Sequence, residues 1–305
     1  MAIQYSFERY EKKYFLTPEQ QALLLERLRE RMTPDEYGAY TLCNIYYDTD
    51  DWRLIRASLA GGGYKEKLRV RSYGVPAADG NVFVELKRKC GGVVYKRRIS
   101  VAAGMAEPLV LASAGLTPAP SCGPASREGG SASLDVSFGG GPAPASHMRG
   151  SSAPGASGLW TPDGASAGAD VPALADCGQV GRELDWFERT YRAYPRVFIG
   201  YDRQALAGRE DAGLRVTFDT NLRYRLDALD LRAGDYGAPL LPDGRILMEI
   251  KIPGVCPLWL SRSLSELDIR PASFSKYGAC YREHILPKVF SHALHNNTKE
   301  ALLSA

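Results

Sequence analysis

Long hydrophobic runs are missing from this 305-residue sequence, and no stretch of about 18 apolar residues is present that could span a membrane. The first residues, MAIQYSFERYEKKYF, carry charges at once and lack the apolar core of a signal peptide. The six cysteines form no CxxC pair and have no histidine at ligand spacing, so a zinc site is not expected. These absences predict a cytoplasmic protein with reduced thiols and no membrane span.

A Walker A loop is also missing, because the glycines at 61–63 are not followed by the Lys-Ser/Thr pair that such a loop needs. No Ser-His-Asp or Cys-His arrangement stands out either. Any nucleotide binding would therefore not use a P-loop, and the chemistry would not depend on a side-chain nucleophile.

Charged and large apolar residues become rare between about 113 and 176, where Ala, Gly, Ser and Pro dominate. Such a segment buries too little apolar surface to offset the entropy lost on ordering it. We therefore expect a disordered insertion there. It would interrupt a single domain that covers residues 1–305, although the length alone would allow about two domains.

The rest of the chain predicts strands in runs rather than strict β-α-β alternation, which is typical of an antiparallel α+β protein. Strands are expected over 5–16, 41–47, 64–73, 82–89, 93–101, 197–206, 213–219 and 246–252. A helix is predicted after Thr17, which can cap it, with Pro18 in the first turn and Gln20 completing a capping box. Further helices are expected from Asp50, over GRELDWFERTYRAY up to Pro195, in the Leu- and Ser-rich segment after 252, and at the end of the core, near 274.

The strands share one pattern, because residues two apart on a strand lie on the same face. In KLRVRSY, for example, the cations alternate with Leu68 and Val70. The charged faces hold twelve cations: Arg9, Lys13, Lys67, Arg69, Arg71, Lys87, Lys89, Lys96, Arg98, Arg203, Arg215 and Lys251. They hold four acids, Glu11, Glu85, Asp219 and Glu249, so these faces carry about +8 while the whole chain carries +3.

A solvated sheet face could explain each strand taken singly, because such faces are commonly polar. Seven strands that line one surface mainly with Arg and Lys should, however, repel one another unless a polyanion is bound. Arg matches phosphate oxygens, and carboxylates among phosphate-binding cations are natural ligands for Mg²⁺ or Mn²⁺. A closed antiparallel β-barrel of about eight strands, with a basic lumen and helices covering its apolar outside, would satisfy these requirements.

With these charged strands in view, the sequence resembles a known family, the VTC domain of polyphosphate polymerases. This family is a branch of the triphosphate tunnel metalloenzyme (CYTH-like) superfamily. The matching strings are RYEKKY, IYYDT, KLRVRSY, VELKRK, YKRR, GYDR, LRVTFD, MEIK and SFSKYG, in the order of the family. The CYTH pattern ExExK is here RxExK with Arg9 at its first place, which moves the first strand toward the VTC branch.

The resemblance implies a tunnel of eight strands that binds triphosphate, nucleotide and polyphosphate. It implies catalytic roles for Arg69, Arg71, Arg203, Arg215 and Lys276, phosphate contacts from Lys13, Lys87, Lys96, Tyr201 and Lys251, and metal binding at Glu249. Strand alternation adds Lys67, Lys89 and Arg98 to the phosphate-binding candidates.

The implied activity is transfer of the ATP γ-phosphate to a growing inorganic polyphosphate chain, with Mn²⁺ or Mg²⁺. Two alternatives remain at this stage: a hydrolase of triphosphate or of nucleoside triphosphates, and a polyphosphate-binding module without turnover. The partners would be ATP and inorganic polyphosphate. The sequence does not show whether a membrane protein is a further partner. Nucleic acid is not expected, because few aromatic residues lie on the basic faces to stack on bases.

Overall fold

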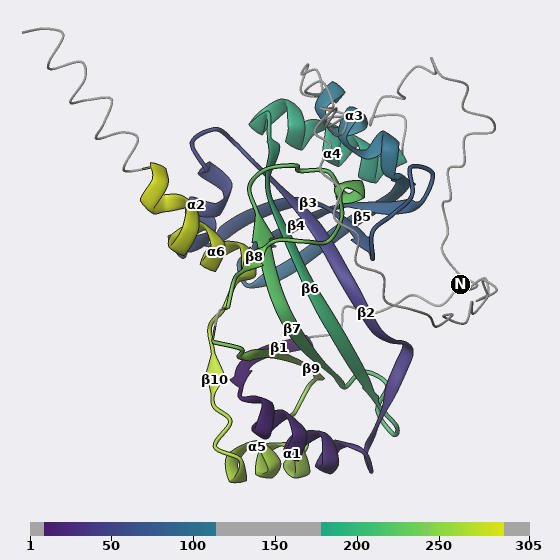
Figure 1. Cartoon of the computed structure of the whole chain (residues 1–305), viewed down its shortest axis with the longest axis vertical. Coiled ribbons are helices and arrows are strands. Elements are labelled where there is room, and N and C mark those ends of the chain that lie inside the picture. The colour runs from purple at the N-terminus through teal and green to yellow at the C-terminus, as the bar shows by residue number, and fades with distance from the viewer. Residues whose placement is uncertain (1–8, 114–177, 242, 290–305) are drawn as a thin grey trace, which may run out of the picture.

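The computed structural model describes residues 9–113, 178–241 and 243–289 (Figure 1). The predicted insertion at about 113–176 lies, apart from its first residue, outside these ranges. The strands are β1 (Arg9–Leu16), β2 (Met32–Asp48), β3 (Tyr64–Tyr73), β4 (Asn81–Cys90), β5 (Val93–Ala102), β6 (Tyr194–Gly208), β7 (Arg215–Arg225), β8 (Ala238–Pro239), β9 (Ile246–Pro253) and β10 (Pro271–Ala272). The α-helices are α1 (Pro18–Leu28), α2 (Arg53–Leu59), α3 (Ala103–Ser113), α4 (Gly178–Tyr191), α5 (Leu258–Glu266) and α6 (Lys276–Cys280).

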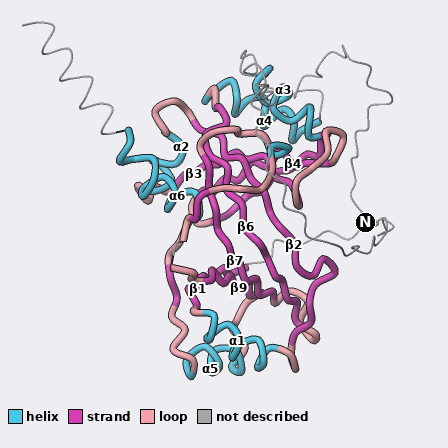
Figure 2. The backbone as a smooth tube through the Cα atoms, viewed as in Figure 1, coloured by secondary structure: helices cyan, strands magenta, loops and turns pink. Residues whose placement is uncertain are grey.

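The strands form one antiparallel sheet in the order β10-β1-β9-β7-β6-β2-β3-β4-β5, with β8 beside β7. The prediction of an antiparallel sheet with helices is therefore confirmed. The long strands β2, β6 and β7 run through the middle of the molecule, between a helix pair at each end (Figure 2). No helix in the described part of the chain has the length and apolar character that crossing a membrane requires.

The predicted closure of the sheet into a barrel is not confirmed, because the pairings in the described ranges run as an open path from β10 to β5. The sheet is curled instead, so that Lys13 of β1 and Lys96 of β5 line the same cavity. The short pairing of β10 with β1 and two side-chain hydrogen bonds tie the segment before α6 to the sheet. The ammonium of Lys13 donates to the carbonyl of Phe274 (2.9 Å), and that of Lys67 donates to the hydroxyl of Ser275 (3.3 Å).

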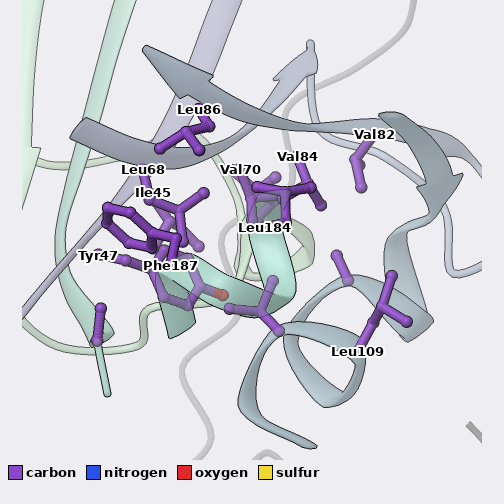
Figure 3. Close-up of a cluster of buried hydrophobic side chains, with 14 of the residues drawn as sticks. Ile45, Tyr47, Leu68, Val70, Val82, Val84, Leu86, Leu109, Leu184 and Phe187 are labelled. Carbon is purple, nitrogen blue, oxygen red and sulfur yellow. The ribbon is translucent and has the colours of Figure 1, made fainter. Parts of the chain in front are cut away.

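Helices cover the apolar outer face of the sheet at both ends (Figure 1). Helices α3 and α4 pack on β3 and β4, where Phe187 and Leu184 of α4 meet the outward-facing Val84 and Leu86 (Figure 3). Helices α1 and α5 pack on β7 and β9 at the other end, where a second buried cluster includes Leu24. The strand alternation predicted from the sequence therefore places the apolar residues of these strands outside the curl, under helices.

The start of α1 is formed by the predicted capping box. The hydroxyl of Thr17 accepts from the Gln20 backbone amide (3.2 Å), and the Gln20 side chain accepts from the Thr17 amide (3.0 Å). Two of the amides left free at a helix start are thereby satisfied, which fixes the direction in which the chain leaves β1.

Several elements differ from the sequence expectations, and β2, for example, begins at Met32 rather than at 41. No element was predicted between 101 and 113, where α3 forms; Pro108 lies inside this helix, and burial of the apolar side chains that follow outweighs the lost hydrogen bond. Helix α4 ends at Tyr191, before Pro195, because Arg192 takes a left-handed conformation (φ 50°) and β6 begins at Tyr194. Strand β7 continues beyond 219 after a bulge near Asn221 (φ 49°).

One end of the concave face is apolar. Helices α2 and α6 and the π-helical turn Tyr281–Ile285 pack against it, in a buried cluster that includes Ile55 of α2 and Ile199 of β6. Asp48, the last residue of β2, caps α2 by accepting from the amides of 54 and 55, and its carboxylate also accepts from the Tyr277 hydroxyl (2.8 Å). These contacts fix α6 so that its N-terminus faces the remaining, open part of the concave face.

Candidate active site

The open part of the concave face is a cavity of about 300 Å³, here called the basic cavity. Strands β1 to β6 and β9, together with α6, contribute to its wall, and the contribution of β2 is Tyr46. Its lining residues are Glu11, Lys13, Tyr46, Lys67, Arg69, Arg71, Glu85, Lys87, Val94, Lys96, Tyr201, Arg203, Glu249, Lys251, Ser275 and Lys276. Nine of them are Lys or Arg and three are Glu, so the cavity has a strong positive excess.

The structure brings eleven of the thirteen predicted site residues together around this cavity. The exceptions are Arg98 and Arg215. Arg98 lies over the Phe83 ring (4.3 Å), and Arg215 donates to Asp35 (2.7 Å) and to the Tyr40 hydroxyl (3.4 Å). Lys89, the further candidate from strand alternation, is exposed and also lies outside the lining.

One wall of the basic cavity is organised around a single carboxylate, in what we call the Glu85 cluster (Glu85, Arg69, Arg71, Lys96 and Arg98). The Glu85 carboxylate lies 2.7 Å from Arg69 Nη2 and 2.6 Å from Lys96 Nζ. Arg98 and Arg71 are farther away, at 3.7 and 3.9 Å. Burial alone would raise the pKa of Glu85, but Arg69, Arg71 and Lys96 outweigh it and lower the pKa to about 2.

A row of three lysines crosses β3, β4 and β5 next to this cluster. Lys67, Lys87 and Lys96 are directly opposite one another in the register of the three strands. Like charges in such positions repel, and burial together with the charges of Lys87 and Lys13 lowers the pKa of Lys67 to about 8. This row is therefore suited to a bound polyanion, which would relieve the repulsion.

The opposite wall holds what we call the Asp219–Glu249 cluster (Asp219, Glu249, Lys13, Arg203 and Lys276). Asp219 accepts from Arg203 Nε (2.6 Å) and Nη2 (2.8 Å) and from Lys276 Nζ (2.6 Å). Glu249 makes longer contacts, 3.5 Å to Lys13 and to Arg203 and 3.6 Å to Lys276. Burial would raise the pKa of Glu249, and the surrounding cations, Lys276 and Lys13 foremost, lower it.

Tyrosines support both walls. Tyr201 accepts from Arg71 Nη2 (3.2 Å) and presents its ring to Lys276, whose ammonium lies 4.3 Å from the ring centroid. Tyr46 accepts from Arg69 Nη1 (3.2 Å) and stacks on Tyr277 of α6 (4.7 Å). Burial would raise the pKa of Tyr46, but Arg69 and then Arg71 lower it to about 8.

Metal binding would have to use few protein ligands. In residues 9–113, 178–241 and 243–289, no group of three or more His, Cys, Asp or Glu is arranged to hold a metal ion. Glu11 and Glu249 do converge, since the Lys13 ammonium lies 3.7 Å from one carboxylate and 3.5 Å from the other. Mg²⁺ bound at phosphates commonly uses one or two carboxylates, so this donor set fits an ion that arrives with its phosphate ligands.

Sequence reasoning singled out neither Tyr46 nor Asn44 and gave Asp219 no role of its own beyond that of an acid on the basic faces, although all three contact predicted site residues. Asn44 accepts from Arg71 Nε (2.7 Å). Alternation in LCNIYYD places Asn44 and Tyr46 on one face, opposite the apolar Ile45, so the signal was present. A tyrosine or an asparagine on a strand is too common to single out without its neighbours.

Comparison with known proteins adds the family. The model of the VTC domain matches residues 8–284. The chain belongs to the VTC domain family. VTC is the polyphosphate polymerase or triphosphate-tunnel type of domain, and the resemblance noted from the sequence strings is thereby confirmed. A search of curated proteins found no match.

Among solved structures, a Vibrio parahaemolyticus protein described as a candidate adenylate cyclase matches this VTC domain with a TM-score of 0.37 and 10% identity, covering 90% of this chain and 98% of that one. A Hippeastrum protein described as a candidate adenylyl cyclase with a dominant triphosphatase activity matches with a TM-score of 0.38 and 15% identity, covering 89% and 94%.

The VTC domain therefore presents a cavity with nine cations and three carboxylates. Arg side chains offer planar, paired donors to phosphate oxygens, and lysines offer compact charge. Such a site can bind several linked phosphates, hold them in one line and stabilise charge that moves between them.

Proposed function

We propose that this VTC domain is a polyphosphate polymerase, which transfers the γ-phosphate of ATP to the end of a growing inorganic polyphosphate chain inside the basic cavity. The observation that carries the proposal is the lining of the cavity, where nine Lys and Arg side chains face only three glutamates. A site that binds one triphosphate in several contacts can equally accommodate a donor and an acceptor built of the same phosphate units.

The reaction requires positioning and charge stabilisation more than covalent chemistry. A terminal oxygen of the acceptor chain forms a bond to the γ-phosphorus, and the bond from that phosphorus to the bridging oxygen of ADP breaks. ADP leaves with the electron pair. Arg69 and Arg71 on one wall and Arg203 and Lys276 on the other would hold the two phosphate groups in line and stabilise the charge on the leaving group.

The proposal includes a divalent ion, Mg²⁺ or Mn²⁺, held by Glu249 and Glu11 together with phosphate oxygens. It would supply charge neutralisation to the phosphates when bound. The long contacts of Glu249, 3.5 to 3.6 Å from three cations, support this role, because they leave its oxygens able to take a closer partner.

The test is the product formed from ATP. Purified protein is incubated with ATP and Mn²⁺, and polyphosphate is separated on a gel while ADP, orthophosphate and tripolyphosphate are quantified. Long polyphosphate formed with one ADP per phosphate added is the expected result. Orthophosphate or tripolyphosphate alone would overturn the proposal in favour of hydrolysis, and tight binding without turnover would leave only a polyphosphate-binding module.

Variants of cavity residues, compared with a surface control, test whether the activity resides in the cavity. Lys276→Met and Glu249→Gln each remove one charge from its wall and are expected to reduce polyphosphate synthesis by about 100-fold or more. Arg270→Gln is the control, because Arg270 pairs with Asp268 on the surface, 2.8 Å away, and does not line the cavity. Full activity in Glu249→Gln at low Mn²⁺ would contradict the metal role.

A further inference from the structure

Asp219 is a buried carboxylate beside the basic cavity that the proposed reaction does not use. It lies on β7 directly opposite Arg203 of β6 in the strand register, and its side chain is fully buried. Asp219 is not among the residues that line the cavity. It therefore stands behind the wall, on the side of Arg203 that faces away from the space a substrate would occupy.

Short contacts link this carboxylate to two elements. Both oxygens of Asp219 accept from Arg203, at 2.6 and 2.8 Å, in the paired geometry that fixes the plane of a guanidinium group. The second oxygen also accepts from Lys276 Nζ at 2.6 Å. Because Lys276 is the first residue of α6, Asp219 connects the sheet to the helix that closes the end of the cavity.

Glu249 has the same two cations as neighbours but meets them differently. It lines the cavity, and its contacts to Arg203 and Lys276 are 3.5 and 3.6 Å. The two carboxylates therefore have different roles. Asp219 holds both cations at hydrogen-bond distance from behind the wall, whereas Glu249 faces the cavity with longer contacts.

The pKa of Lys276 also points to a larger role for Asp219 than for Glu249 in holding this cation. Lys276 is nearly buried, and burial on its own would lower its pKa, but Asp219 and then Glu249 outweigh burial and raise the pKa. Because both cations donate to the same oxygen of Asp219, they lie close together, and without the Asp219 charge they would repel each other with only Glu249 nearby to balance them.

We propose that Asp219 is a positioning residue, which holds the Arg203 guanidinium and the Lys276 ammonium at fixed points of the cavity wall so that both meet the phosphate chain already oriented. The inference rests on the proposed phosphate-binding function of the cavity. It assigns no contact between Asp219 and phosphate.

The sign of the effect of Asp219→Asn separates positioning from simple charge. Asparagine keeps the size of the side chain and removes one negative charge next to an anion site. If Asp219 acted only through its charge, phosphate would bind the variant more tightly, because the cavity becomes more positive. If Asp219 positions the two cations, phosphate binds less tightly, because neither cation is held in place.

The experiment measures binding of inorganic tripolyphosphate to the full chain by calorimetry, together with the kcat and KM of polyphosphate synthesis. Asp219→Asn is expected to weaken tripolyphosphate binding by about 10-fold and to reduce kcat further. Asp202→Asn is the matched control. Asp202 is paired with Arg223 (3.3 Å) on the same two strands but away from the cavity, so binding should stay within about 2-fold of the wild type.

A second variant keeps the test decisive if Asp219→Asn does not fold. Asp219→Glu preserves the charge and displaces the carboxylate by one methylene, so positioning predicts weaker binding and lower kcat, while a pure charge effect predicts wild-type values. Binding that is unchanged or tighter in either folded variant overturns the proposal. So does a loss of thermal stability in both variants with wild-type affinity, since that marks a structural role alone.

The outcomes also separate this inference from the proposed function. A wild-type protein that binds no tripolyphosphate overturns both. A wild-type protein that binds tripolyphosphate but makes no polyphosphate overturns the polymerase, while the Asp219 variants still decide the positioning role from binding alone.

Discussion

Both walls of the basic cavity combine cations with carboxylates, but in different ratios. The Glu85 cluster has one carboxylate for four cations, whereas the Asp219–Glu249 cluster has two carboxylates for three. The first wall therefore keeps a large positive excess and also adjoins the lysine row of Lys67, Lys87 and Lys96. The second wall is nearly neutral, and its cations are already held in place.

One wall of the cavity therefore supplies most of the positive charge, and the opposite wall supplies cations that are already oriented. The Glu85 wall is suited to attract and neutralise a polyphosphate chain, and the Asp219–Glu249 wall is suited to orient the groups that act on it. A divalent ion at Glu249 would add positive charge to the wall that has the smaller excess.

The largest effect is expected from Arg69→Gln. Arg69 has its Nη2 2.7 Å from Glu85 and its Nη1 3.2 Å from the Tyr46 hydroxyl, so its guanidinium is held in the plane that faces the cavity. Its loss removes a preorganised donor, and kcat/KM for polyphosphate synthesis should fall by about 100- to 1,000-fold. Steady-state kinetics beside the surface control Arg270→Gln measure this, and a fall of less than 5-fold would contradict the division of roles.

Glu188 is a buried carboxyl group outside both walls, and its pKa is governed by burial. Glu188 of α4 is fully buried, accepts from the Ala193 amide (3.2 Å), and burial raises its pKa to about 8. A carboxyl group whose pKa is raised in the folded state stabilises the fold at low pH, and that contribution is lost as the pH rises from about 4.5 toward 8. Over this window the free energy of unfolding should fall by on the order of 3 kcal/mol in the wild type.

Glu188→Gln removes this titration, so its free energy of unfolding should change much less between pH 5 and 8. Urea denaturation at a series of pH values measures both curves. Parallel curves for the two proteins would mean that Glu188 is ionised in the folded state.

Glu85 should show the opposite pH dependence, with a smaller magnitude. Its lowered pKa, about 2, means that its contribution to stability is present above pH 4.5 and is lost as the pH falls toward 2. Glu85→Gln should cost about 1 to 2 kcal/mol at pH 7, since Lys96 and Arg98 are almost half exposed and screened by solvent.

Added tripolyphosphate tests why Glu85→Gln should lower the free energy of unfolding. If Glu85 balances the cations of its wall, added tripolyphosphate should stabilise Glu85→Gln more than the wild type, as seen in the midpoint of thermal unfolding at low salt. An equal increase in both proteins would speak against a balancing role.

The smallest effect concerns Lys67. Its pKa of about 8 means that much of its charge is lost between pH 7 and 9, so tripolyphosphate affinity should fall by about 3- to 10-fold over that range. Lys67→Arg keeps the charge, because arginine does not deprotonate in proteins, and should flatten this dependence. The ligand titrates identically in both experiments, so calorimetry on the two proteins isolates the lysine; identical slopes would exclude it.

Much of this molecule could be predicted from its sequence, because strand alternation is a local signal. The pattern in KLRVRSY and VELKRK placed Leu68 and Leu86 outside and Arg69 and Lys87 inside, as the structure has them. The capping box at Thr17 was equally local. These features depend only on residues close together in the chain.

The features that could not be predicted depend on distant partners. Asp219 was recognised only as an acid on a basic face, since its meaning comes from Lys276 on a different element. Arg215 belonged to the predicted set, yet Asp35 in the long strand β2 holds it outside the lining. Closure of the sheet likewise depends on how strongly the whole sheet curls, which no single strand encodes.

The position of β1 has a consequence for the order in which the protein is made. This first strand pairs on both sides with strands near the other end of the described chain, β9 (Ile246–Pro253) and β10 (Pro271–Ala272). A ribosome adding about 5 to 20 residues per second needs roughly 10 to 50 s to go from one to the other. During that time the backbone edges of β1 have no partner strand, and Lys13 has no Glu249 to meet. Nascent chains would therefore emerge with an incomplete cavity wall, and the site would be complete only after the last of its lining residues, Lys276, has been synthesised.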